Sequence, residues 1–159
     1  MGIGISIGPD PQGVLSPYPS VEMAEAYLRE AKVRLEAAKM ALTEWREYAF
    51  CIRMSQEAVE LSIKACLRLA GIEYPKTHDP GRLLIPYADR FPEWFRAEIE
   101  YMAEISRWLS AERGPAMYGD EAEGAPPTAL YTEGYARKAL EAAMRIYELA
   151  VKYIGEVAR

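Results

Sequence analysis

Apolar residues recur every three or four positions along several long stretches of the chain, a period typical of amphipathic helices. After Ser20, a suitable N-cap, one face of a predicted helix consists of Ala24, Leu28, Ala31, Leu35, Ala38 and Leu42. A second helix, over 51–69, has a face of mostly small side chains: Cys51, Ser55, Ala58, Ser62, Ala65 and Leu69. Small side chains let another helix approach closely. We therefore expect these two consecutive helices to pack as an antiparallel hairpin.

The chain beyond the second helix carries one helix stop and one helix start. Gly71 adopts the left-handed conformation at little steric cost and is a typical helix end. Asp79 followed by Pro80 is a typical start, because a carboxylate accepts the free N–H groups of a first turn and proline suits the first helical position. We therefore expect a short helix over 80–90, with His78 at its entrance.

Two further helices are predicted in the second half of the chain. The first begins at Pro92 and extends to about Ser110, and one of its faces consists of Phe95, Ile99, Met102, Ser106 and Leu109. Three aromatic side chains lie off that face and suggest a second apolar contact: Trp94, Tyr101 and Trp108. The last helix begins after Thr132, and its apolar face consists of Ala136, Leu140, Ala143, either Ile146 or Tyr147, Ala150, Ile154 and Val157.

Two segments are expected to lie outside the helices. Residues 1–20, rich in glycine and proline, predict a flexible N-terminal arm; the alternating Ile3, Ile5 and Ile7 leave open a short strand against a partner subunit. Residues 111–131 predict a long acidic loop whose charges are solvated, since their order matches no calcium-loop spacing. The fold expected for 21–159 is all-α, an up-and-down bundle of four to five helices.

Composition narrows the class of protein. With 159 residues the chain predicts one domain, and its net charge of -5 argues against an electrostatic nucleic-acid binder, so we expect no DNA partner. No apolar stretch approaches the roughly 20 residues that cross a bilayer, and the first 20 residues do not resemble a signal peptide, so we expect no membrane contact and a cytoplasmic location. Asn is absent and Glu, Arg and Lys are abundant, a bias that suits a thermophilic, prokaryotic source.

The central part of the chain resembles the HEPN family of small helical domains. The matching residues are Gln56, Glu57, Ala58, Glu60, Lys64 and Ala65, followed by Gly71, Thr77, His78, Asp79, Leu83 and Leu84. The resemblance implies a helical bundle that pairs with a minimal nucleotidyltransferase in a toxin–antitoxin-like system, and it raises binding of a nucleotide. Because the small-residue faces and extra aromatics offer more apolar surface than a monomer needs, we also expect a homodimer.

The residues that could carry chemistry are few. His78 is the only histidine, so one chain cannot build a His-based metal site, and we expect neither metal nor cofactor. His78 with Asp79 could form an acid–base pair or contact a nucleotide, but the preferred interpretation is that both residues cap the following helix together with Thr77. Lys64 could bind a phosphate, but the preferred interpretation is that it belongs to a row of surface ion pairs. The sequence leaves open whether Gln56 is buried or exposed.

HEPN members that cleave RNA carry an arginine followed four to six residues later by a histidine. Here Arg113 is followed by Tyr118, and a phenol with an ordinary pKa of about 10 is a poor base at neutral pH. The leading hypothesis is therefore a non-catalytic binding module. It expects His78 to lie too far from Arg113 for nuclease chemistry, and a His78 within hydrogen-bonding reach of Arg113 would overturn it. The alternatives are a metal-independent ribonuclease using Arg113, Tyr118 and His78, and an adaptor without ligand. The candidate nucleotide-binding residues are Lys64, His78, Asp79, Arg82, Arg113 and Tyr118.

Overall fold

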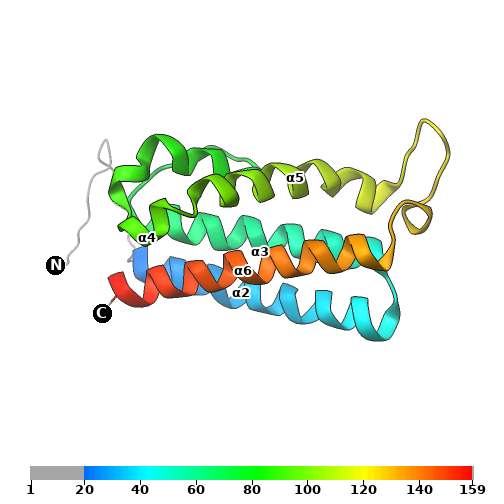
Figure 1. Cartoon of the computed structure of the whole chain (residues 1–159), viewed down its shortest axis with the longest axis horizontal. Helices are drawn as coiled ribbons and strands as arrows, with labels where there is room; N and C mark the ends of the chain where they lie inside the picture. The colour runs from blue at the N-terminus through cyan, green and yellow to red at the C-terminus, as the bar shows by residue number, and fades with distance from the viewer. Residues whose placement is uncertain (1–19, 159) are drawn as a thin grey trace.

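The computed structural model describes residues 20–158, in which four long helices lie side by side (Figure 1). The helices are α2 (Ser20–Met40), α3 (Tyr48–Leu69), α5 (Ile99–Tyr118) and α6 (Glu133–Val157). Within 20–158 the structure contains no strand, only one isolated bridge between Asp120 and Ala125, so the all-α prediction is confirmed. The predicted N-terminal arm with Ile3, Ile5 and Ile7 lies outside the described residues.

Helix α3 lies at the centre of the bundle and contacts α2, α5 and α6. Its predicted seam is confirmed, because every residue of that face is buried except Leu69, which is half-buried. The predicted face of α2 is buried from Ala24 to Ala38, and it continues with Leu42 in the following π-helical turn, η1 (Ala41–Trp45). Small side chains thus line the helix at the centre, as close helix packing requires.

The end of α3 has the predicted form. Gly71 has a φ of +75°, and the N–H of Ile72 donates to the carbonyl of Leu67 at 2.9 Å. The N–H of Gly71 donates to the carbonyl of Arg68 at 3.1 Å, which completes a Schellman stop. At the start of α6 the side chain of Thr132 accepts from the N–H of Tyr135, so this predicted N-cap is confirmed too.

The segment predicted as a helix over 80–90 is a 3₁₀ segment, η2 (Gly81–Arg90), bent where Tyr87 has non-helical φ and ψ. The predicted cap at Asp79 is wrong, because no side chain caps the start of η2. The Asp79 carboxylate instead accepts a hydrogen bond of 2.7 Å from the Ser106 hydroxyl, whose oxygen accepts the N–H of Gly81 at 3.0 Å. These contacts hold η2 against α5.

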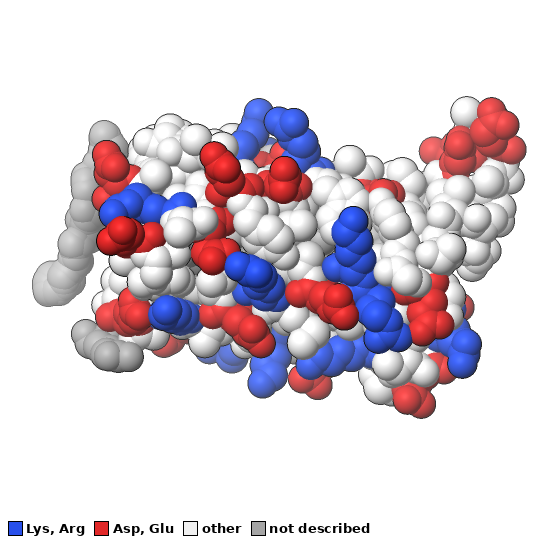
Figure 2. All heavy atoms as spheres, in the orientation of Figure 1, with Lys and Arg blue, Asp and Glu red and all other residues white. Residues whose placement is uncertain are grey.

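The predicted loop over 111–131 is also wrong in its first part. Helix α5 continues through Gly114 and Pro115 to Tyr118. Tertiary contacts outweigh the two helix-breaking residues here, because Ala116 is buried and the Glu112 carboxylate accepts hydrogen bonds from the hydroxyl groups of two later residues, Tyr131 and Tyr135. The remaining connection to α6 contains the turn η3 (Pro127–Ala129), and acidic side chains gather at its tip (Figure 2).

The predicted helix over 92–110 divides into α4 (Glu93–Arg96) and α5, with its predicted apolar face buried. The three aromatics off that face find their second contact on α6 of the same chain. Lys152 lies over the Trp94 ring at 4.1 Å, Arg145 lies over the Tyr101 ring at 4.8 Å, and Trp108 donates to the Tyr135 hydroxyl at 2.7 Å. No helix within 20–158 is long and apolar enough to cross a membrane.

Candidate functional site

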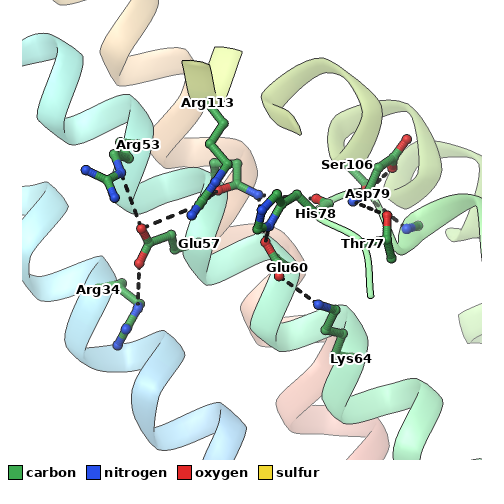
Figure 3. A network of polar contacts seen from close by, with 12 residues as sticks. Arg34, Arg53, Glu57, Glu60, Lys64, Thr77, His78, Asp79, Ser106 and Arg113 are labelled. Atoms are coloured by element: carbon green, nitrogen blue, oxygen red, sulfur yellow. Dashed lines mark hydrogen bonds and ion pairs between the residues drawn. The ribbon is translucent and has the colours of Figure 1, made fainter. Parts of the chain in front are cut away.

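A cavity of about 210 Å³ opens beside α3, where α2, α5 and the segment before η2 approach it. We call it the arginine cavity. It is lined by Arg34, Glu57, Glu60, Leu61, His78 and Arg113. Figure 3 shows its polar side chains, which come from separate parts of the chain and point toward one another.

Three guanidinium groups converge on the carboxylate of Glu57 (Figure 3). Arg34 Nε lies 3.0 Å from Oε1, while Arg53 Nε and Arg113 Nη1 lie 3.5 and 3.6 Å from Oε2. The Nε group of Arg53 is buried and has no hydrogen-bond partner. Arg34 also pairs with Glu30 at 2.8 Å, so two carboxylates face three guanidiniums and one positive charge is left over at this point of a chain whose net charge is -5.

Gln56 connects the two sides of the cavity and is 2% exposed. Its Oε1 accepts from Arg113 Nη1 at 2.8 Å. Its Nε2 donates to Glu60 Oε1 at 3.0 Å and to the backbone carbonyl of His78 at 3.2 Å. The sequence leaves the environment of Gln56 open, and the structure shows a buried amide that joins α5 to the His78 segment through α3.

His78 and Lys64 both contact the carboxylate of Glu60. His78 Nδ1 lies 3.0 Å from Oε1, and Lys64 Nζ donates to Oε2 at 2.7 Å. Burial raises the pKa of the Glu60 carboxyl, but hydrogen bonds from Lys64, Gln56 and His78 outweigh it, so the pKa lies below its ordinary value. Because a carboxylate only accepts, the contact favours a proton on Nδ1 of neutral His78 and leaves Nε2 as an acceptor.

The candidate nucleotide-binding residues do not form one site. His78 and Arg113 line the arginine cavity, and Lys64 reaches it through Glu60. Asp79 and Arg82 line a separate cavity of about 250 Å³ between η2 and α5. Tyr118 is 63% exposed and is absent from the lining of either cavity.

The expectation that His78 lies far from Arg113 is wrong, because both residues line one cavity and both bond to Gln56. No direct hydrogen bond joins them among the described residues. The prediction missed Arg34 and Arg53. Arg53 could have been found from its position four residues before Glu57, whereas Arg34 lies on another helix and has no local signal. Residues 20–158 hold no group of three metal-ligating side chains.

Comparison with known proteins agrees with this architecture. The model of the HEPN domain family matches residues 24–154. The crystal structure of ST0689, an archaeal HEPN homologue, is 24% identical with a TM-score of 0.63, and the match covers 82% of this chain and 97% of that one. The crystal structure of TT1696 from Thermus thermophilus is 26% identical with a TM-score of 0.64 and the same coverage. No curated protein matches significantly. The chain belongs to the HEPN domain family.

Proposed function

We propose that the chain is a non-catalytic HEPN module that binds the phosphate of a nucleotide in the arginine cavity. The observation that carries this proposal is the convergence of Arg34, Arg53 and Arg113 on the single carboxylate of Glu57. Guanidinium groups present several N–H donors in a planar fork that suits phosphate oxygens. The leftover positive charge and the open cavity beside it favour an anionic ligand.

The position of Tyr118, which stands where the ribonuclease motif has a histidine, supports a binding role. Arg113 is held by Gln56 and Glu57, and Tyr118 lies outside the cavity. A general base must come within hydrogen-bonding reach of the group that it deprotonates. Tyr118 is therefore a poor candidate for a base acting beside Arg113.

Calorimetric titration with AMP tests the proposal. We expect saturable binding to the parent protein, and a loss of about tenfold or more in affinity for both Arg34→Ala and Arg113→Ala, since hydrogen bonds between charged groups are strong. Arg137→Ala is the matched control, because Arg137 pairs with Glu133 on α6 and does not line the cavity. Absence of saturable heat with the parent would contradict the proposal and favour the adaptor without ligand.

We propose further that the module is a homodimer that works with a minimal nucleotidyltransferase in a toxin–antitoxin-like system in the cytoplasm. Family membership supports the partner. Exposed apolar side chains support the dimer, including Trp45 at 53%, Tyr118 at 63% and Met117 at 41% exposure. Co-purification with a nucleotidyltransferase encoded beside this gene tests the first point, and the mass in solution at micromolar concentration tests the second.

A second candidate function is a metal-independent ribonuclease. The observation that favours it is the contact of His78 with Glu60 in the same cavity as Arg113, because a carboxylate that orients an imidazole is a common arrangement for a general base. RNA cleavage that is lost in both His78→Ala and Arg113→Ala, and kept in Arg137→Ala, would establish this function and overturn the non-catalytic one.

A further inference from the structure

We infer that the arginine cavity selects a terminal phosphomonoester over an internal phosphodiester, and that Glu57 sets this preference. The inference rests on the proposed phosphate site and names the ligand class that the site takes. It follows from the position of Glu57, which already holds the guanidinium groups that a phosphate would need.

An incoming anion must compete with the Glu57 carboxylate. The side chain of Glu57 is 18% exposed and lines the cavity, with Arg34 and Arg113 on either side at 3.0 and 3.6 Å. A phosphodiester carries one negative charge, the same as the carboxylate. Exchanging one for the other gains no net charge at the guanidiniums, and it leaves the displaced carboxylate in need of solvent or another partner.

A phosphomonoester carries between one and two negative charges at pH 7 and has three terminal oxygens. It can therefore attract the guanidiniums more strongly than Glu57 does. A terminal oxygen that replaces Glu57 Oε2 would also face the Nε of Arg53, which lies 3.5 Å from that carboxylate oxygen and makes no hydrogen bond. Of the two ligand classes, only the monoester therefore attracts the guanidiniums more strongly than the Glu57 carboxylate does.

The size of the cavity explains why the phosphate, rather than the base, is recognised. A volume of about 210 Å³ lies below the roughly 300–1,000 Å³ of pockets that enclose drug-sized ligands. Among residues 20–158, Leu61 is the only aliphatic side chain in the lining. A phosphate group fits within these walls while the base stays outside, so AMP and GMP are expected to bind alike.

The test compares AMP with 3′,5′-cyclic AMP, which has the same base and a single diester charge. Dissociation constants are measured for the parent, Glu57→Gln and Glu30→Gln. Glu30 is the matched control because it pairs with Arg34 at 2.8 Å but is 58% exposed and does not line the cavity. Thermal unfolding of each variant checks that it folds.

We expect the parent and Glu30→Gln to prefer AMP by about tenfold, and Glu57→Gln to bind the cyclic ligand more tightly and to prefer AMP by less than about threefold. Equal binding of the two ligands by the parent would overturn the inference, as would an unchanged preference in Glu57→Gln. Failure of both ligands to bind the parent would instead refute the proposed function.

A readout on the parent alone remains if Glu57→Gln does not fold. The second pKa of a phosphomonoester is about 6, so lowering the pH from about 7.5 to about 5.5 converts most of the AMP from dianion to monoanion and leaves the charge of the cyclic AMP phosphate unchanged. The ratio of the two affinities should fall toward one, and a constant ratio would overturn the inference.

Comparing 5′-phosphorylated with 5′-hydroxyl trinucleotides shows whether RNA ends bind as AMP does: preference for the phosphorylated end supports the inference, and equal binding counts against it.

Discussion

Arg113 on α5 donates a hydrogen bond of 2.8 Å to the side chain of Gln56 on α3. The same amide donates to the backbone carbonyl of His78 at 3.2 Å. One buried side chain of α3 therefore bonds both to the guanidinium of Arg113 and to the backbone of His78.

Replacement of Gln56 by leucine should damage stability and binding together. Leucine fills a similar volume but leaves the His78 carbonyl and the Arg113 guanidinium without their partner, at a cost of about 1–3 kcal/mol in the free energy of unfolding. Urea unfolding and AMP titration measure the two effects. Ser62→Ala is the control, because the Ser62 hydroxyl is buried without a hydrogen-bond partner and its removal should cost little. Unchanged AMP affinity in Gln56→Leu would contradict the positioning role.

Replacement of Gly81 by alanine should destabilise the contact between η2 and α5. An added Cβ would lie 2.5 Å from the Ser106 Cβ and 2.9 Å from the Ala103 Cα. Overpacking of this kind costs about 1–3 kcal/mol. The variant should also bind AMP more weakly, since the displaced segment carries His78. A melting temperature equal to that of the parent would show that the backbones can separate without cost.

Gly114→Ala provides the opposite expectation and tests the length of α5. An added Cβ at position 114 meets nothing within 4 Å, and Gly114 lies inside the helix. Alanine in an exposed helix interior is more stable than glycine by about 0.5–1 kcal/mol. A rise in the free energy of unfolding supports the extended helix, and a fall would favour the loop that the sequence predicts.

Acid should reveal the charge network around Glu60. Its pKa is lowered in the folded protein, so its contribution to stability is complete above the ordinary value of 4.5 and is lost as the pH falls through the lower folded value. Glu60→Gln should therefore show a smaller loss of stability between about pH 5 and about pH 3, measured as the urea midpoint. Glu121→Gln, at the exposed tip, is the control. Identical acid profiles for Glu60→Gln and the parent would refute this role.

Trp45→Glu should separate dimerisation from folding. The Trp45 ring is 53% exposed and lies 6.3 Å from the Phe50 ring, so little intramolecular packing is lost. We expect a change in the free energy of unfolding within about 0.5 kcal/mol and a mass that falls to that of a monomer in light scattering. Val33→Glu, 58% exposed on α2, is the control. A dimer that persists in Trp45→Glu would place the interface elsewhere.

The core could be predicted from the sequence better than the site. Helical periodicity identifies the buried faces of α2 and α3, and local chemistry identifies the stop at Gly71 and the cap at Thr132, because these features depend on neighbours within one or two turns. The extent of α5 escapes prediction because the contact of Glu112 with Tyr131 and Tyr135 comes from residues after the apparent breakers.

The arginine cavity could be predicted only in part. Gln56, Glu57 and Glu60 are spaced to share one side of a helix, but nothing local shows that Arg34 from α2 and Arg113 from α5 reach the same point. The position of His78 just before a predicted helix suggests a role in capping. The structure instead ties it to Glu60, a contact across 18 positions that spacing alone does not encode.

Helix α3 both packs against the other three long helices and contributes residues to the arginine cavity. Its buried side holds α2, α5 and α6 together, and its polar edge carries Gln56, Glu57 and Glu60. A substitution that rotates or shifts α3 would therefore disturb both ligand binding and the stability of the whole bundle. Substitutions on α3 that would tighten binding are therefore constrained by the packing of the interior, and adaptive change is expected first at Arg34, which α2 supplies.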